Sequence, residues 1–307
     1  MPDTVARAVR FDRFGGPEVL YVTEIPMPEP GPGEVVVAVR AAGVNPGESG
    51  IRSGALERLY KTTLPSGQGS DLAGVVTAIA PGVTDFAIGD EVLGFSWSRS
   101  SHATHTAVPV TQLIPKPQAL SWEVAGSLYV VACTAYAAVR AIGVKPGETV
   151  AVSAAAGGVG TVTVQLLRHV GARVLGIASP SNADWLAAHG AVQVSYDDGL
   201  RDRLRAETPD AFIDLFGPQY VDLAVSLGIP HDRIETIIAF EAAARLGVKA
   251  EGSEQASTVE VLHHMADLVA SGAIEIPIAA TYPLDRVADA YREVDRRHTR
   301  GKIVLLP

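Results

Sequence analysis

The sequence of 307 residues has a single cysteine, Cys133, and no excess of positive charge. One thiol cannot form an intramolecular disulfide, and no cysteine cluster is available to hold a structural zinc ion. Lys and Arg number 25 against 34 Asp and Glu, a net charge of −9 that argues against nucleic acid or an anionic membrane surface as a partner. No run reaches the roughly 18 apolar residues that a membrane helix requires, and the N-terminus lacks a signal-peptide pattern. We therefore expect a cytoplasmic protein that acts on a small molecule.

The composition, 47% hydrophobic and 19% charged, is typical of a globular chain long enough for two domains. In the first 125 residues, short apolar or alternating runs lie between Gly and Pro turns, and such spacing predicts a small β-barrel. Strands are expected at 7–11, 19–25, 35–41, 74–79 and 91–95.

A glycine motif follows a short apolar run at 150–152, which is suited to a buried strand. The motif reads Ala155-Ala156-Gly157-Gly158-Val159-Gly160. Apolar residues then recur at spacings of three and four as far as Val170, which predicts a helix that Gly171 ends, and 173–178 supply a second strand. This strand, glycine turn, helix and parallel strand place unpaired backbone N–H groups and a positive helix end against a pyrophosphate, and therefore predict dinucleotide binding.

The end of the second strand indicates which dinucleotide binds. An NAD site usually has Asp or Glu about 20 residues beyond the glycines, where the acid holds the ribose 2′-hydroxyl. Here the segment is Ala178-Ser179-Pro180-Ser181-Asn182. Hydroxyl and amide groups donate to a phosphate, so NADPH is favoured over NADH. No Lys or Arg follows the strand to bind the phosphate firmly, so a loop without cofactor preference is the alternative.

Beyond residue 179, strand-like and helix-like segments continue to alternate, which predicts an α/β fold with a parallel sheet covered on both faces. Further strands are expected at 192–196, 211–215, 234–240, 274–278 and 302–306. Helices are expected at 122–142, 184–189, 199–207, 258–271 and 284–295.

Six segments then occur in a fixed order along nearly the whole chain. They are Gly43-Val44-Asn45-Pro46, Gly69-Ser70-Asp71-Leu72-Ala73-Gly74, Gly89-Asp90-Glu91-Val92, Thr134-Ala135-Tyr136, Ala154 to Gly160, and Arg300-Gly301-Lys302. Together they resemble the zinc-independent quinone oxidoreductase branch of the medium-chain dehydrogenase/reductase superfamily. The resemblance implies a GroES-like β-barrel domain, 1–125 completed by 271–307, into which a doubly wound Rossmann domain, 126–270, is inserted. It also implies NADPH in the cleft, and we expect a homodimer.

Zinc-dependent members of the superfamily supply the test for a metal. By the resemblance, their catalytic zinc needs a Cys near 43–45, a His-Glu pair after Gly69, and a further ligand ahead of Thr134. This chain has Asn45 and Ser70-Asp71 at the first two places and apolar residues at the third. We therefore expect no metal.

Without a metal, the remaining chemistry is hydride transfer from the nicotinamide to an electron-poor carbon of a quinone or an α,β-unsaturated carbonyl compound. The charge moves to oxygen, where modest hydrogen-bond donors are enough, and a phenol or water can deliver the proton. By the resemblance, Asn45 and Tyr60 are the catalytic residues, while Gly50 replaces a second family tyrosine.

The motif and the resemblance together also predict the cofactor-binding residues. Asn182 occupies the place of a family lysine, and Tyr196 matches a tyrosine near the 2′-phosphate. The predicted set is Asn45, Thr134, Ala155, Gly157, Gly158, Val159, Gly160, Ser179, Asn182, Tyr196, Phe216 and Gly217.

Two other functions remain open. One is a biosynthetic enoyl or enone reductase with a dedicated substrate, and the other is a non-catalytic NADPH-binding sensor. A short-chain dehydrogenase fits less well, because the glycine motif begins after about 150 residues and Arg140, not Lys, follows Tyr136 by four residues.

Overall fold

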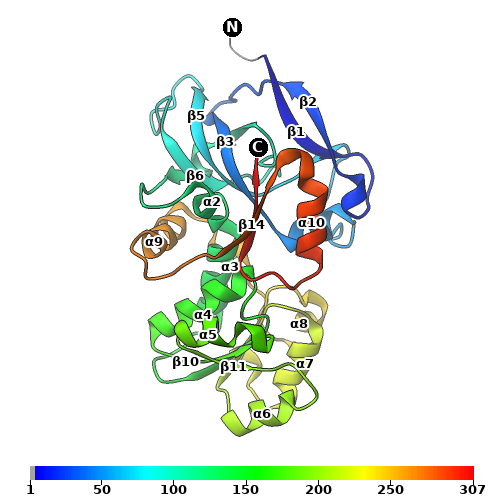
Figure 1. The fold of residues 1–307 in the computed structure, drawn as a ribbon, viewed down its shortest axis with the longest axis vertical. Coiled ribbons are helices and arrows are strands. Elements are labelled where there is room, and N and C mark those ends of the chain that lie inside the picture. Colours follow the sequence, from blue (N-terminus) through cyan, green and yellow to red (C-terminus); the bar gives the residue numbers. More distant parts are fainter. Residues whose placement is uncertain (1–3) are drawn as a thin grey trace. The chain divides into compact units, whose positions relative to one another are not determined.

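The computed structural model describes residues 4–307, which divide into two compact units (Figure 1). The first contains the residues up to Val130, together with Thr258–Ala273 and Pro277–Pro307. The second contains Val131–Ser257 and Ile274–Ile276. The second unit is thus inserted into the sequence of the first. The predicted insertion extended to residue 270, whereas the structure groups the helix at 259–270 with the first unit.

Antiparallel strands dominate the first unit. Its larger sheet has the order β14-β15-β3-β5-β6-β8, with β7 also paired to β3, and a smaller sheet has the order β2-β1-β4. The strands are β1 (Val5–Phe11), β2 (Tyr21–Pro26), β3 (Glu34–Val44), β4 (Ser66–Gly67), β5 (Asp71–Ile79), β6 (Glu91–Phe95), β7 (His105–Pro109), β8 (Leu113–Pro115), β14 (Ile278–Pro283) and β15 (Lys302–Leu306).

Strand β3 is the centre of this unit. Val35, Val36 and Val37 are all buried because the strand is covered on both faces, and it pairs with β5, β7 and β15. At its far end Val304 of β15 lies opposite Gly43. The C-terminal strand therefore runs beside the Gly43-Val44-Asn45 segment, although about 260 residues separate them in the chain.

The helices at 46–52 and 122–142 differ from the prediction, and most of the second segment, from Val131 onward, belongs to the second unit. Helix α1 (Pro46–Arg52) was not predicted, because its two glycines and its proline read as a turn. The single helix expected at 122–142 is two helices, α2 (Trp122–Ala125) and α3 (Leu128–Ala141). Gly126 ends α2 at a close approach, where a Cβ atom would lie 2.4 Å from the Ala41 carbonyl oxygen. Helices α9 (Val259–Ala270) and α10 (Val287–Asp295) belong to the first unit.

The second unit has a five-stranded parallel sheet, as predicted, with the order β11-β10-β9-β12-β13. Its strands are β9 (Thr149–Val152), β10 (Arg173–Ile177), β11 (Ala191–Val194), β12 (Ala211–Asp214) and β13 (Ile234–Thr236). Its helices are α4 (Gly158–Val170), α5 (Ala183–Ala188), α6 (Leu200–Glu207), α7 (Pro218–Ser226) and α8 (Phe240–Leu246). Because β10 and β12 lie on opposite sides of β9, the strand order reverses there, and ligands of such sheets bind at the carboxyl ends beside this point.

Two predicted strands of the later chain are wrong in extent. The strand at 234–240 ends at Thr236, and α8 begins at Phe240. The strand expected at 274–278 begins only at Ile278. Gln165 accounts for this difference, because its side chain donates to the Glu275 carbonyl at 2.9 Å and accepts from the Glu275 N–H at 2.8 Å, in place of a neighbouring strand. Among residues 4–307, no helix has the length and apolar character needed to span a membrane.

Candidate functional site

The glycine motif lies where β9 leads into α4. Gly157 is the N-cap of α4, and no side chain caps this end. The N–H groups of the first helical turn are therefore available to a ligand, at the positive end of a 13-residue helix. Gly171 ends the same helix with a φ of 91°, as the sequence predicted.

Two glycines of the motif face different surroundings. A Cβ atom on Gly160 would lie 2.1 Å from the Ala154 carbonyl oxygen, so only glycine lets α4 begin this close to the strand end. A Cβ atom on Gly157 would meet only that oxygen, at 3.3 Å. Gly160 is therefore required for packing, whereas the side of Gly157 is open to an approaching pyrophosphate.

Asp214, which sequence reasoning missed, organises the carboxyl ends of the three strands β9, β12 and β13. Its side chain is fully buried. It accepts hydrogen bonds from Ser153 Oγ at 2.7 Å and Thr236 Oγ1 at 2.8 Å, and from the N–H groups of Phe216 at 2.9 Å and Gly217 at 3.1 Å. The predicted cofactor residues Phe216 and Gly217 are thus held at the sheet edge by a buried carboxylate. The sequence feature that could have identified Asp214 is an acidic residue at the end of an apolar strand.

The residues predicted to face the 2′-phosphate lie at the ends of β10 and β11. Ser179 Oγ and Ser181 Oγ are 3.1 Å apart in the turn before α5, and Asn182 ends that turn. Tyr196 lies just beyond β11 and is 53% exposed. Gln193 joins the two strand ends, since its Nε2 donates to the Ala178 carbonyl at 2.7 Å. Thr134, another predicted cofactor-binding residue, lies on none of these segments and is buried in the middle of α3.

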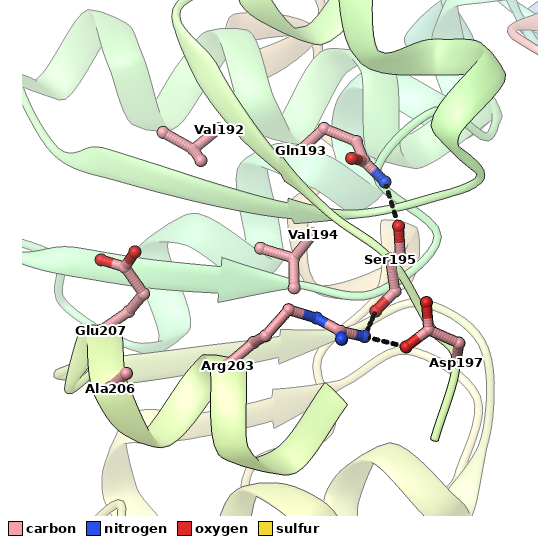
Figure 2. Close-up of a pocket in the computed structure, with 8 residues that line it drawn as sticks. All are labelled: Val192, Gln193, Val194, Ser195, Asp197, Arg203, Ala206 and Glu207. Atoms are coloured by element: carbon pink, nitrogen blue, oxygen red, sulfur yellow. Dashed lines mark hydrogen bonds and ion pairs between the residues drawn. The ribbon is translucent and has the colours of Figure 1, made fainter. Parts of the chain in front are cut away.

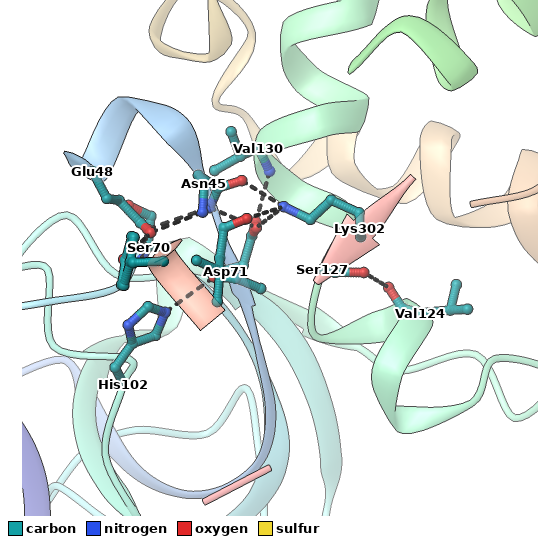
Figure 3. Close-up of polar contacts among 12 residues, drawn as sticks. Asn45, Glu48, Ser70, Asp71, His102, Val124, Ser127, Val130 and Lys302 are labelled. Carbon is teal, nitrogen blue, oxygen red and sulfur yellow. Dashed lines mark hydrogen bonds and ion pairs between the residues drawn. The ribbon is translucent and has the colours of Figure 1, made fainter. Parts of the chain in front are cut away.

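In the first unit, Asn45 lies at the centre of a buried polar network (Figure 3). Its Nδ2 donates to Asp71 Oδ2 at 3.0 Å and to Glu48 Oε1 at 3.3 Å, and its Oδ1 accepts from Lys302 Nζ. The ammonium group of Lys302 cannot accept a hydrogen bond, which fixes the orientation of the amide. Both N–H groups of Asn45 are therefore engaged by carboxylates, and the predicted donation to a substrate oxygen would require one of these bonds to break.

Asp71 and Lys302 are site residues to which the sequence assigned no role. Lys302 Nζ lies 3.3 Å from Asp71 Oδ2 and donates to the Val44 carbonyl at 3.2 Å. Asp71 Oδ1 accepts from the Val130 N–H at 2.7 Å, near the start of α3. Burial raises the pKa of Asp71, which the Lys302 charge and the bonds from Val130 and Asn45 oppose. Both residues lie in segments that resemble motifs of the family, and this resemblance is the sequence feature that could have identified them.

Tyr60, the second predicted catalytic residue, lies on a different segment. It follows α1 in a series of turns and is 36% exposed. Its N–H donates to the Leu56 carbonyl at 2.8 Å. Next to it, Thr62 accepts a hydrogen bond from Arg99 at 3.1 Å, which ties the turn segment to the loop after β6.

The residues at the positions where zinc-dependent relatives carry metal ligands make hydrogen bonds within the protein. Asn45 and Asp71 take part in the network with Lys302, and Ser70 donates its N–H to Glu48 Oε1 at 2.8 Å. Across residues 4–307 there is no group of three or more His, Cys, Asp or Glu side chains arranged to hold a metal ion.

Two family models match the chain. A zinc-binding dehydrogenase model matches residues 149–305, and an alcohol dehydrogenase GroES-like domain model matches residues 31–118. Quinone oxidoreductase from Pseudomonas aeruginosa is 30% identical over 99% of this chain and 100% of its own length. A pikromycin polyketide synthase component of Streptomyces venezuelae is 31% identical over 91% of this chain, which corresponds to 8% of that much longer protein.

Solved structures agree with these matches. Quinone oxidoreductase from Coxiella burnetii has a TM-score of 0.88 and 30% identity, covering 99% of both chains. A mycobacterial protein complexed with NADPH has a TM-score of 0.85 and 26% identity, covering 98% of this chain and 100% of its own. The fold is therefore a Rossmann sheet combined with a GroES-like domain, as predicted. The chain belongs to the zinc-independent quinone oxidoreductase branch of the medium-chain dehydrogenase/reductase superfamily, a family of oxidoreductases.

Proposed function

We propose that the chain is an NADPH-dependent reductase that transfers hydride to quinones or α,β-unsaturated carbonyl compounds without a metal ion. The observation that carries this proposal is the uncapped N-terminus of α4 beside a β10 end that bears no acid. Backbone N–H groups and a positive helix end suit a pyrophosphate, and the absence of an acid removes the repulsion of a 2′-phosphate. When bound, NADPH supplies the hydride.

The buried network suggests a changed role for Asn45. Its contacts with Asp71 and Glu48 use both hydrogens of Nδ2, and Lys302 uses one lone pair of Oδ1. The second lone pair of Oδ1 is therefore the one hydrogen-bonding position of the side chain that these contacts leave. We infer that Asn45 accepts a hydrogen bond from a hydroxyl or amide of the cofactor, and that Lys302 and Asp71 hold it in that orientation. The donor to the substrate oxygen is then Tyr60, whose phenol can also deliver the proton.

An aromatic cluster in the first unit supports a planar acceptor. Phe95 and the buried Tyr129 stack with ring centroids 4.0 Å apart, and Trp97 meets Phe95 edge-to-face at 5.6 Å. Trp97 is 49% exposed, and the preceding residue, Ser96, donates its N–H to the Ser70 carbonyl at 2.8 Å. A half-exposed indole on rigid aromatic support, near the Asp71 network, offers a flat face to a quinone or conjugated enone.

The second candidate is a biosynthetic enone reductase with one dedicated substrate. It is favoured by the similarity to part of a polyketide synthase component. Both candidates use the same network and the same cofactor. They differ only in which acceptor is turned over well.

Oxidation of NADPH against a panel of quinones, enones, enals and simple aldehydes tests the proposal. We expect turnover of quinones and enones, little turnover of saturated aldehydes, and slower rates with NADH. High turnover of a single enone with poor activity on all quinones would favour the dedicated reductase. Binding of NADPH with no turnover of any acceptor would identify a sensor and contradict the proposal.

A further inference from the structure

The proposed site for the 2′-phosphate lacks a positive charge on the segment where one is expected. A ribose 2′-phosphate carries close to two negative charges, and charge-assisted hydrogen bonds from Arg or Lys are the strongest contacts it can make. The turn after β10 offers only Ser179, Ser181 and Asn182. A cation for the phosphate must therefore come from a neighbouring element of the second unit.

The carboxyl end of β11 is that neighbour. Strands β10 and β11 pair in parallel, with Ile177 opposite Val194, so their ends lie side by side. Gln193 Nε2 reinforces this arrangement, because it donates both to the Ala178 carbonyl at 2.7 Å and to Ser195 Oγ at 3.2 Å. A side chain held at Ser195 is consequently close to the segment that follows β10.

Arg203 is held at this position. It projects from α6, and its Nη2 donates to the Ser195 carbonyl at 2.7 Å and to Asp197 Oδ1 (Figure 2). These contacts bracket Tyr196, the residue already predicted to lie near the phosphate. The Arg203 side chain is 42% exposed, so a ligand can reach it. The guanidinium has five N–H donors, and those not used by Ser195 and Asp197 remain for an anion.

A cavity of about 350 Å³ lies beside this arginine. Eight of the described residues line it. Among these eight, Arg203 is the one cation, and Asp197 and Glu207 are the two acids. Glu207 is paired with Arg173 at 2.7 Å and is thereby partly neutralised. Asp197 forms its ion pair with Arg203 and also accepts a hydrogen bond from the Gly199 N–H at 3.3 Å, so it is the acid that competes with a phosphate for the guanidinium.

We propose that Arg203 binds the 2′-phosphate of NADPH, keeps its hydrogen bond to the Ser195 carbonyl, and exchanges its ion pair with Asp197 for the phosphate. This inference rests on the proposed function, because it assigns a residue to the cofactor named there. Arg203 thus takes the role of the lysine that Asn182 replaces. Asp197 weakens the same contact by repulsion.

Dissociation constants of NADPH and NADH, measured by fluorescence titration, test the assignment. Arg203→Ala should raise the dissociation constant of NADPH about tenfold or more and leave that of NADH within about twofold, because only NADPH carries the phosphate. Asp197→Asn should tighten NADPH severalfold. Arg203→Lys should restore part of the NADPH affinity. The NADPH affinity of the wild type should also fall more steeply with salt than that of Arg203→Ala.

Arg205→Ala is the matched control, since Arg205 lies on the same helix and pairs with the exposed Asp202. It should change neither constant. Unchanged NADH binding in each variant shows that the fold is intact. A wild type that prefers NADPH together with an Arg203→Ala variant of the same preference would overturn this inference alone. A wild type that binds neither nucleotide, or both equally, would overturn the proposed cofactor use as well.

Discussion

At the scale of single residues, the surroundings of a side chain limit what it can do. Asn45 was predicted from its motif to donate to a substrate oxygen, yet both of its N–H groups are used by Asp71 and Glu48. The pattern of residue types was informative, but the direction of the hydrogen bonds was not contained in it. We therefore propose Tyr60 as the donor.

Replacing Tyr60 by Phe tests this assignment. We expect kcat for an enone to fall about 10-fold to 100-fold, the scale of a lost proton donor or oxyanion contact, with NADPH affinity nearly unchanged. Tyr21→Phe, at another partly exposed tyrosine of the first unit, is the control and should have no effect. Wild-type turnover in a folded Tyr60→Phe variant would leave solvent as the proton source.

Glu235 predicts a dependence of stability on pH. This residue of β13 is fully buried, with one carboxyl oxygen bonded to the Glu251 N–H at 2.6 Å and the other without a partner among the described residues. Burial raises the pKa of Glu235 from 4.5 to about 8. Between these values the folded protein holds a proton that the unfolded chain releases. The contribution to stability is therefore full below pH 4.5 and falls as pH rises towards 8, by about 1.4 kcal/mol per unit.

Urea denaturation at pH 6 and pH 8 measures this effect. The wild type should lose about 2 to 3 kcal/mol more than Glu235→Gln over this interval. Glu241→Gln, at an exposed acid on α8, should follow the wild type. Equal losses in the wild type and in Glu235→Gln would show that Glu235 is ionised throughout.

At the scale of elements, two glycines at the start of α4 are expected to have different roles, one in ligand binding and one in packing. Gly157→Ala should leave the melting temperature nearly unchanged and weaken NADPH binding at least tenfold, because its new methyl group lies on the open side of the turn. Gly160→Ala should lower stability by about 1 to 3 kcal/mol, because its Cβ atom would overlap the Ala154 carbonyl. Thermal melts and NADPH titrations of both variants measure the split. Equal loss of stability in the two would contradict these separate roles.

At the scale of the whole molecule, the chain belongs to a family whose model is named for zinc, but its own residues at the zinc positions, Asn45, Ser70 and Asp71, include no Cys or His, and Asp71 is paired with Lys302. We predict that dialysis against a chelator leaves turnover unchanged and that elemental analysis finds well under one zinc per chain. Loss of activity with the chelator and recovery with zinc would show this prediction to be wrong. The homodimer also remains a prediction, which light scattering would check.

The sequence by itself determined the elements whose signals are local. The glycine motif, the apolar spacing of α4 and the terminating Gly171 specify a strand, turn and helix within about 25 residues, so periodicity and backbone freedom were sufficient. The alternation of later segments predicted the parallel sheet for the same reason. The missing acid after β10 could also be read directly, because its place follows from that local unit.

Only the tertiary structure decided the contacts between distant segments. Lys302 reaches Asn45 because β15 pairs with β3, and Arg203 reaches the edge of the sheet because α6 packs beside β11. The segment at 274–276 is not a strand because the side chain of Gln165 satisfies its backbone. Each outcome depends on hydrogen bonds between residues that are far apart in the chain, and neither propensity nor spacing carries that information.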